Sequence, residues 1–259
     1  MTSAAALKNN QGAPMIAANA VKHAAATGAL IRGLHMTFTA PAVIEVVASE
    51  RLDFVYIDGE HGCFEWRDIE LLCITAERHG LTPIARIPDP SSATITRFLD
   101  RGVRGIVVPH VESLDDARRV IDAAYFAPAG TRSFGAGRPE YWESGAERAA
   151  YMAACNGAVS VCMMIESAEG LALADQIARV PGVDYLSFGL LDLAQSLGHP
   201  GDSAHPVVRK AVADCTARIN QAGKRVREDF MRFAWVNDVL RAGMRSLLDG
   251  KGGAAAHSA

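Results

Sequence analysis

The chain of 259 residues has a formal net charge of −3 and is 49% hydrophobic. This balance provides no basic surface for nucleic acid, and no apolar run reaches the roughly 18 residues that a membrane span needs. The N-terminus lacks the basic segment and continuous apolar core of a signal peptide, and the five cysteines include no C-x-x-C pair. We therefore expect a cytoplasmic protein whose cysteines stay reduced.

Short apolar runs alternate with amphipathic stretches along the chain. The apolar runs predict strands at 33–38, 54–58, 82–87, 105–111, 159–167 and 185–190. The amphipathic stretches predict helices at 40–50, 66–79, 91–101, 114–124, 169–179 and 205–222. Buried strands that alternate with helices form parallel βαβ units. Six or more such units favour a (β/α)8 TIM barrel, with a doubly wound sheet as the alternative.

Two segments interrupt this pattern. Residues 127–150 form a long insertion, either a surface loop or, through Arg132 and Arg138, a lid that contacts anions in an oligomer. After Lys224, only residues 225–237 precede the next helical run, and this length cannot hold two strands and a full helix. The barrel is therefore expected to be irregular or incomplete at its seventh βα unit.

The predicted organisation is one barrel domain at 29–249. An N-terminal extension or helix at 1–28 precedes it. The Gly/Ala-rich residues 250–259 are expected to form a flexible tail.

The segment DGEHG at 58–62 directly follows an apolar strand. The carboxyl ends of parallel strands are where α/β proteins place their chemistry. His61 is the candidate general base, and Asp58 or Asp100 could hold its second ring nitrogen. Asp58 and Glu60 are expected to orient His61 rather than to react. The histidines His35 and His110 lie on predicted strands and are weaker candidates.

Further polar side chains follow the other strands. Arg86 lies in an apolar strand, where a guanidinium needs an anionic partner. It is either a clamp on a carboxylate or enolate oxygen, or half of a structural ion pair with Asp58 or Glu60. Glu166 and Asp192 follow the fifth and sixth strands. They are either helix caps or ligands of a hard divalent cation, preferably Mg²⁺ or Mn²⁺, with Co²⁺ tolerated.

The six predicted strands contain no lysine. A Schiff-base aldolase needs a lysine buried in its barrel. In this chain an enolate would therefore have to be stabilised by a metal ion or by arginine.

Several motifs together resemble the HpcH/HpaI aldolase family, the 2,4-dihydroxyhept-2-ene-1,7-dioate and 2-keto-3-deoxy acid aldolases of the phosphoenolpyruvate/pyruvate barrel superfamily. These motifs are FVYIDGEH at 54–61, FLDRG at 98–102, APAGTR at 127–132, IES at 165–167 and GLLDL at 189–193. The resemblance implies a barrel that cleaves or forms a carbon–carbon bond to a pyruvate enolate, starting from 4-hydroxy-2-keto acids. It also implies a homo-oligomer, usually a hexamer built from dimers that exchange their last helices.

The resemblance further implies a role for individual residues. His61 matches the family's proton acceptor, and Asp100 matches the acid that raises its basicity. Arg86 matches the arginine that stabilises the enolate. Glu166 and Asp192 match the two metal ligands. Pyruvate or oxaloacetate, together with an aldehyde or an acyl-CoA, would then be the small-molecule partners.

Two positions depart from the family pattern at the substrate end of the pocket. Met164 stands where the family commonly has a glutamine that touches substrate, and Leu191 lies in GLLD, where the family has Gly-Pro-x-Asp. We expect Met164, Leu191, Asp192 and Arg86 to contact the substrate. The altered pocket supports an alternative, a siderophore-type citrate synthase that condenses acetyl-CoA with oxaloacetate, possibly without metal. The shortened end supports a third reading, a barrel subunit without catalysis.

Overall fold

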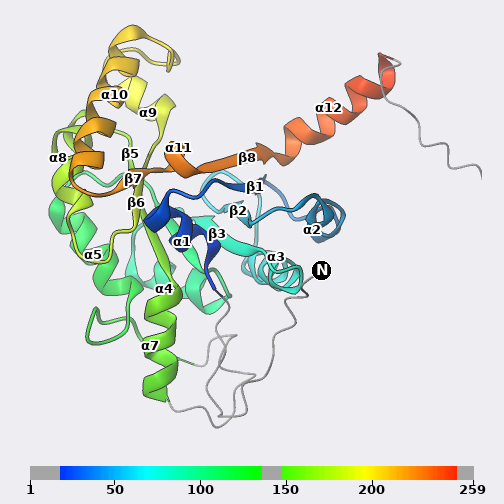
Figure 1. Cartoon of the computed structure of the whole chain (residues 1–259), viewed down its shortest axis with the longest axis horizontal. Coiled ribbons are helices and arrows are strands. Elements are labelled where there is room, and N and C mark those ends of the chain that lie inside the picture. Colours follow the sequence, from blue (N-terminus) through cyan, green and yellow to red (C-terminus); the bar gives the residue numbers. More distant parts are fainter. Residues whose placement is uncertain (1–17, 136–147, 250–259) are drawn as a thin grey trace, which may run out of the picture.

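Eight parallel strands form one curled sheet in the order β7-β6-β5-β4-β3-β2-β1-β8 (Figure 1). This computed structural model describes residues 18–135 and 148–249. The predictions for residues 1–17, for Arg138 and for the tail 250–259 lie outside the described residues. Because β7 and β8 are the two edges of the sheet, the fold is a (β/α)8 barrel that is incomplete between its seventh and eighth strands, as predicted.

The strands are β1 (Ile31–Met36), β2 (Phe54–Asp58), β3 (Thr82–Arg86), β4 (Gly105–Val108), β5 (Ser160–Ile165), β6 (Tyr185–Phe188), β7 (Arg225–Val226) and β8 (Met231–Trp235). The helices are α1 (Ala20–Thr27), α2 (Pro41–Val47), η1 (Ala48–Glu50), α3 (Trp66–Arg78), α4 (Ser92–Asp100), α5 (Leu114–Ala124), α7 (Arg148–Ala158), α8 (Ala168–Ala178), α9 (Leu190–Ser196), α10 (Pro206–Gln221), α11 (Arg227–Phe230) and α12 (Val236–Leu248). Among the described residues, no helix is long and apolar enough to cross a membrane.

The six predicted strands are all present, and β2 has the predicted bounds. The prediction for β1 is displaced by two residues, because the strand begins at Ile31. The prediction for the sixth strand runs two residues too far, since α9 already begins at Leu190. Apolar runs therefore located the strands, whereas their last residues depended on where the next helix starts.

Serine caps begin three of the helices on the outside of the barrel. Ser91, Ser113 and Ser167 each accept a hydrogen bond from the backbone N–H three residues later, at the starts of α4, α5 and α8. Such a cap satisfies one of the free N–H groups of the first turn. These caps fix where the loops at the carboxyl ends of β3, β4 and β5 finish.

Alternation along the strands divides the apolar side chains into two layers. Val55 and Ile57 of β2 pack outward against the helices, whereas Phe54 and Tyr56 join the cluster inside the barrel. Side chains alternate between the two faces of a strand. Asp58, the next residue in the inward series, is therefore directed into the mouth of the barrel.

The end of the barrel is built from residues 225–235, here called the closing segment. It contains the two-residue β7, the four-residue α11 and β8, so two strands are present with one helical turn instead of a full helix. Phe230 of α11 is fully buried, and its ring meets Tyr185 edge-on at 5.2 Å. The closing segment thus fills part of the barrel interior rather than forming an outer layer.

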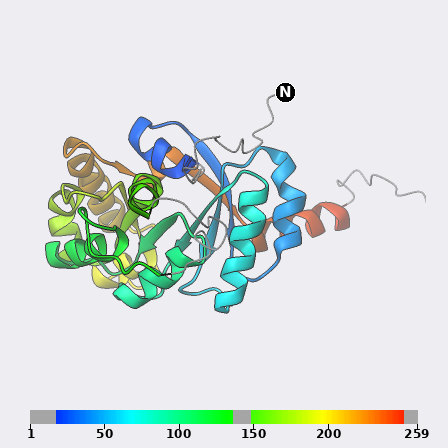
Figure 2. The same ribbon diagram turned by 90° about the horizontal axis from the view of Figure 1, so that it is seen from below.

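The last helix, α12, leaves the body of the barrel in both views (Figure 1, Figure 2). One buried residue, Val236, lies at its start. Its exposed apolar side chains are Val239, Leu240, Met244, Leu247 and Leu248. Burial of an apolar face is the main stabilising contribution to a surface helix, and within this chain α12 has little of it.

Candidate active site

Polar side chains from several strands meet at the carboxyl edge of the sheet. They are Asp58, Glu60 and His61 at the end of β2, Arg86 at the end of β3, His110 after β4, Glu166 after β5 and Asp192 in α9 after β6. In parallel barrels this edge carries the catalytic groups. The strand-end positions inferred for His61, Arg86, Glu166 and Asp192 all lie there.

Arg86 is held by two acids. Its Nε and Nη2 donate to Asp58 Oδ1 and Oδ2 at 2.9 and 2.6 Å, and Glu60 Oε2 lies 3.1 Å from Nε. Burial by itself would raise the pKa of Asp58. Hydrogen bonds from His35 and Arg86, together with the arginine charge, outweigh burial and hold this pKa well below its usual range. Arg86 therefore forms ion pairs with both acids, and none of these contacts uses Nη1.

His61 lies in a tight loop beside these acids. Its backbone N–H donates to Asp58 Oδ1 at 3.2 Å, while its ring Nε2 lies 3.8 Å from Glu60 Oε2. The loop requires glycine at 62, because a Cβ there would lie 2.3 Å from the carbonyl oxygen of Asp58. Asp58 therefore positions the His61 backbone, and Glu60 is the acid that faces its ring. The ring itself is 66% exposed.

Glu166 is, together with Asp58, one of the two fully buried carboxylates of the group. Its side chain is 3% exposed, and Oε2 accepts the backbone N–H of His110 at 3.0 Å. Burial raises its pKa, and the neighbouring charges of Glu60 and Asp192 add to this effect against the opposing influence of His110. The cap of α8 is Ser167, so Glu166 has no capping role.

His110 connects the two halves of the edge. Its Nδ1 lies 3.2 Å from Glu166 Oε2, and its Nε2 lies 3.6 Å from Glu60 Oε1. Its φ of 52° is a left-handed conformation that non-glycine residues seldom adopt and that clusters at functional sites. The sequence alone makes His110 a weaker candidate than His61. The signal was available, since both histidines follow a short buried strand.

The remaining candidates lie on β5 and at the start of α9. Asp192 is exposed in the first turn of α9, whose cap is Gly189, and its charge acts on the Glu166 pKa. Leu191 beside it is 63% exposed, whereas Met164 is buried inside the barrel. Of the two positions that depart from the family pattern, Leu191 lies on the rim of the barrel and Met164 lies in its interior.

Asp100 lies at the other end of the barrel from His61. A helix that follows a strand runs back toward the amino edge, and Asp100 is the last residue of α4. Its Oδ1 accepts a hydrogen bond from Arg132 Nη2 at 2.8 Å. Within one chain the predicted contact between Asp100 and His61 is therefore wrong. Arg132 also stacks on Phe126 near this end, so within one chain it does not cover the carboxyl edge.

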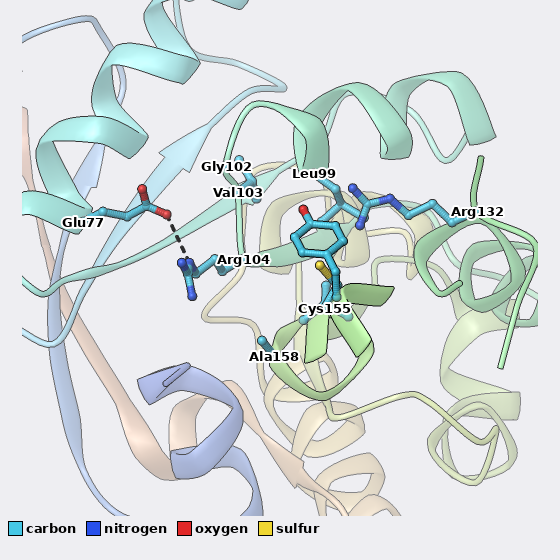
Figure 3. A pocket seen from close by; sticks show the side chains of 10 residues that line it. Glu77, Leu99, Gly102, Val103, Arg104, Arg132, Cys155 and Ala158 are labelled. Atoms are coloured by element: carbon cyan, nitrogen blue, oxygen red, sulfur yellow. Dashed lines mark hydrogen bonds and ion pairs between the residues drawn. The ribbon is translucent and has the colours of Figure 1, made fainter. Parts of the chain in front are cut away.

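A pocket also lies at the amino edge (Figure 3). Its lining residues include Glu77, Leu99, Arg104, Arg132, Tyr151 and Cys155. Arg104 directly precedes β4 and pairs with Glu77 at 3.1 Å, the contact drawn in Figure 3. Because strand-end chemistry occupies the opposite edge, we do not assign this pocket to catalysis.

The carboxyl edge fits a divalent metal ion. Across residues 18–135 and 148–249, no group of three His, Cys, Asp or Glu side chains is arranged to hold a metal by itself. Two carboxylates suit a hard cation that completes its shell with water and substrate oxygens. Glu166 Oε1 also occupies the space of a side chain at Gly189, where a Cβ would lie 1.8 Å away. The charges of Glu60 and Asp192 both act on Glu166, and a cation between such neighbouring acids would offset their repulsion.

An incomplete (β/α)8 barrel with an arginine, a histidine and carboxylates at its carboxyl edge defines a barrel enzyme. The chain belongs to the HpcH/HpaI aldolase/citrate lyase family, whose model matches residues 32–237. It is a carbon–carbon lyase of the aldolase type, and the resemblance read from its motifs is confirmed.

Individual relatives cover most of the chain. A hydroxypyruvate/pyruvate aldolase of Roseovarius nubinhibens is 32% identical over 208 residues, 80% of each chain. A 4-hydroxy-2-oxovalerate aldolase of Rhodococcus jostii is 33% identical over 208 residues, 80% of this chain and 79% of its own. The solved structure of the citrate synthase SbnG has a TM-score of 0.76 at 29% identity, over 89% of this chain and 97% of its own.

Proposed function

We propose that this protein is a class II, metal-dependent aldolase that cleaves 4-hydroxy-2-keto acids to pyruvate and an aldehyde, or joins them in reverse. One observation carries the proposal: the buried Glu166 carboxylate is joined through His110 to Glu60 and Arg86 at the carboxyl edge, where Asp192 also lies. The two aldolase relatives, named for pyruvate and for 4-hydroxy-2-oxovalerate, support the substrate class.

Glu166 and Asp192 would hold the divalent ion, Mg²⁺ or Mn²⁺ with Co²⁺ as a substitute. When bound, such an ion supplies Lewis-acid stabilisation of the negative charge on the enolate. Arg86 adds a second stabilising charge, because Asp58 and Glu60 fix its guanidinium while Nη1 is left to donate to a substrate oxygen.

His61 takes the proton of the 4-hydroxyl group in cleavage, directly or through a water molecule. Its ring is exposed enough to exchange that proton with solvent, and Glu60 lies close enough to orient it. We give Asp100 no part in this step within one chain, because Arg132 holds it at the amino edge. Met164 and Leu191 would supply apolar contacts to the rest of the substrate.

A citrate synthase acting on acetyl-CoA and oxaloacetate is the second candidate. The similarity to the SbnG structure supports it, as do the apolar residues at 164 and 191. Such an enzyme would release free CoA and could work without metal. The metal-binding interpretation of Glu166 and Asp192 would then be superfluous.

One set of assays separates the candidates. Pyruvate release from 4-hydroxy-2-oxovalerate and CoA release from acetyl-CoA plus oxaloacetate are each measured with and without EDTA. The aldolase proposal predicts pyruvate release that stops with EDTA and returns with excess Mn²⁺. CoA release that survives EDTA would favour the citrate synthase. Neither activity under any of these conditions would favour a barrel without catalysis.

We further propose that the chain forms a homo-oligomer through α12, as a hexamer built of dimers that exchange this helix. The exposed apolar residues Leu240, Met244 and Leu247 support this assembly, because such a stripe is normally buried. Sedimentation velocity tests it: Leu240→Glu with Met244→Glu should shift the wild-type oligomer to monomer. A wild-type monomer would contradict it.

We also propose a cytoplasmic location, and the free thiols of all five cysteines support it.

A further inference from the structure

His110 lies in a turn that two neighbouring elements hold in place. It follows β4 by two residues, and the next residue, Val111, donates its backbone N–H to the carbonyl oxygen of Met164 in β5 at 3.3 Å. The start of α8 packs against the same turn, since a Cβ at Gly170 would lie 2.9 Å from the carbonyl oxygen of Val111. The backbone of His110 therefore has a defined position beside the end of β5, where Glu166 follows.

Two polar groups of His110 meet at one oxygen of Glu166. The backbone N–H donates to Oε2 at 3.0 Å, and the ring Nδ1 lies 3.2 Å from the same atom. The φ of His110 is 52°, a left-handed conformation that costs free energy in any residue with a Cβ. In this conformation the main chain and the ring both reach Oε2.

The other oxygen of Glu166 is left on the side of α9. Neither contact with His110 uses Oε1. This oxygen lies against Gly189, where a Cβ would come within 1.8 Å of it. Gly189 is the cap of α9, and Asp192 lies in the first turn of that helix. Oε1 is therefore the oxygen nearer to the helix that carries the second proposed metal ligand.

Packing does not explain why a histidine is held in this turn. Its ring is 59% exposed, so it contributes little to the buried core. The ring Nε2 lies 3.6 Å from Glu60 Oε1, which is too long for a hydrogen bond. The contacts with Glu166 are therefore the closest polar contacts that the left-handed turn provides.

We propose that His110 is a positioning residue for the metal site: it holds Glu166 Oε2, so that Oε1 is left to bind the divalent ion together with Asp192. This inference rests on the proposed metal-dependent function. Groups that hold the carboxylate ligands of a metal ion contribute about 10- to 100-fold to metal affinity. The steric cost of the turn is then the cost of arranging this ligand before the ion binds.

Calorimetric titration of the metal-free protein with Mn²⁺ tests the role of the ring. His110→Gly keeps the backbone N–H and removes the ring, and glycine adopts a positive φ without steric cost. This variant should bind Mn²⁺ about 10- to 100-fold more weakly, while its melting temperature stays the same or rises. A ring that only supported the fold would give a lower melting temperature with unchanged Mn²⁺ affinity, and that result would overturn the inference.

Two further variants separate the ring from the backbone. His110→Asn tolerates the left-handed conformation, and its side-chain amide can take the place of Nδ1, so it should retain most of the Mn²⁺ affinity. Arg51→Gly is the control, because Arg51 has a φ of 58° but lies at the amino edge, before β2. It should bind Mn²⁺ as the wild type does. A loss of affinity in His110→Asn or in Arg51→Gly equal to that in His110→Gly would overturn the inference.

Pyruvate release by the same proteins keeps this inference separate from the proposed function. If Mn²⁺ affinity falls in His110→Gly as expected but the wild type releases no pyruvate, the aldolase proposal fails and the role of His110 stands. If pyruvate release requires Mn²⁺ but the wild type and His110→Gly bind the ion equally, the role of His110 is contradicted and the aldolase proposal stands. A wild type that binds no Mn²⁺ would contradict both.

Discussion

The strands β1 to β6 and the closing segment build the same sheet by different means. Each early strand leads into a helix that packs on the outside, and several of these helices begin at a serine cap. The closing segment has one helical turn between two short strands, and its side chains enter the interior. The regular part supplies the carboxylates, the arginine and the histidines of the site. The closing segment adds the guanidinium of Arg227 and the aromatic ring of Phe233 to the barrel interior.

This difference raises the question of whether the closing segment belongs to the stable core. Phe230 of the closing segment and Phe98 of α4 are both almost fully buried. Replacing a buried phenylalanine with alanine costs about 3–5 kcal/mol. We expect Phe230→Ala and Phe98→Ala to lower the free energy of unfolding by similar amounts in urea titrations. A loss below about 1 kcal/mol for Phe230→Ala alone, the scale of a surface change, would show a closing segment that is loosely attached.

The buried ion pair of the regular part should contribute far more than a surface pair. Arg86→Ala leaves Asp58 buried without its partner, which costs about 3–5 kcal/mol. Arg118→Ala breaks an exposed pair with Asp115 and should cost less than about 1 kcal/mol. Equal effects in thermal or urea unfolding would contradict the buried network. The size of the Arg86 effect also means that the activity of its variants has to be judged with the folded fraction measured.

The close approach of Gly189 to Glu166 should make this glycine necessary for activity. A Cβ at 189 would meet Glu166 Oε1 at 1.8 Å, so Gly189→Ala must displace the carboxylate or the backbone. A misplacement of about 1 Å can cost about 100-fold in rate. Gly157→Ala is the control, since a Cβ at 157 in α7 meets nothing within 4 Å. The same kcat/KM in both variants would show that Glu166 need not be held there.

The smallest effect concerns His35, which lies between the two regions. It faces Asp58 on one side and stacks on Trp235 of the closing segment at 3.7 Å. Burial lowers its pKa below the ordinary 6.5, and the hydrogen bond to Asp58 opposes this only in part. Below pH 6.5 the unfolded chain therefore binds a proton that the folded chain does not yet bind. The free energy of unfolding should therefore decrease as the pH is lowered below 6.5, by at most about 1.4 kcal/mol per pH unit for one group.

His35→Phe tests this dependence because it removes the titrating group and keeps an aromatic ring. Urea unfolding at pH 7.5 and pH 5.5 should show a smaller loss of stability in the variant than in the wild type. The same pH dependence in both proteins would assign the effect to other groups.

The sequence predicted the parts of the site that depend on local pattern. A short apolar run followed by a polar residue located Asp58, Arg86 and Glu166 at strand ends, because strand direction fixes which end is the mouth. The contacts of Arg86 with both Asp58 and Glu60 could be stated only as alternatives. Which acids pair with Arg86 depends on how the side chains of neighbouring strands pack against each other.

Other features could not be predicted, because they depend on contacts between distant segments. Asp100 was placed beside His61 by motif alone, although the length of α4 carries it to the amino edge. The inward position of Arg227 has no local sequence signal, because nothing near it indicates that the chain turns inward after β7. The shortness of 225–237 did predict an incomplete barrel, because chain length limits any crossover.

The most direct test of the account is the rate of pyruvate release by Glu166→Gln at saturating Mn²⁺, compared with the wild type. The substitution keeps the size of the side chain and removes the charge that would hold the metal ion. The account predicts a rate lower by about 100-fold or more, the scale of losing one charge-stabilising group, with the melting temperature retained. A rate close to that of the wild type would contradict a metal-dependent aldolase site at this edge of the barrel.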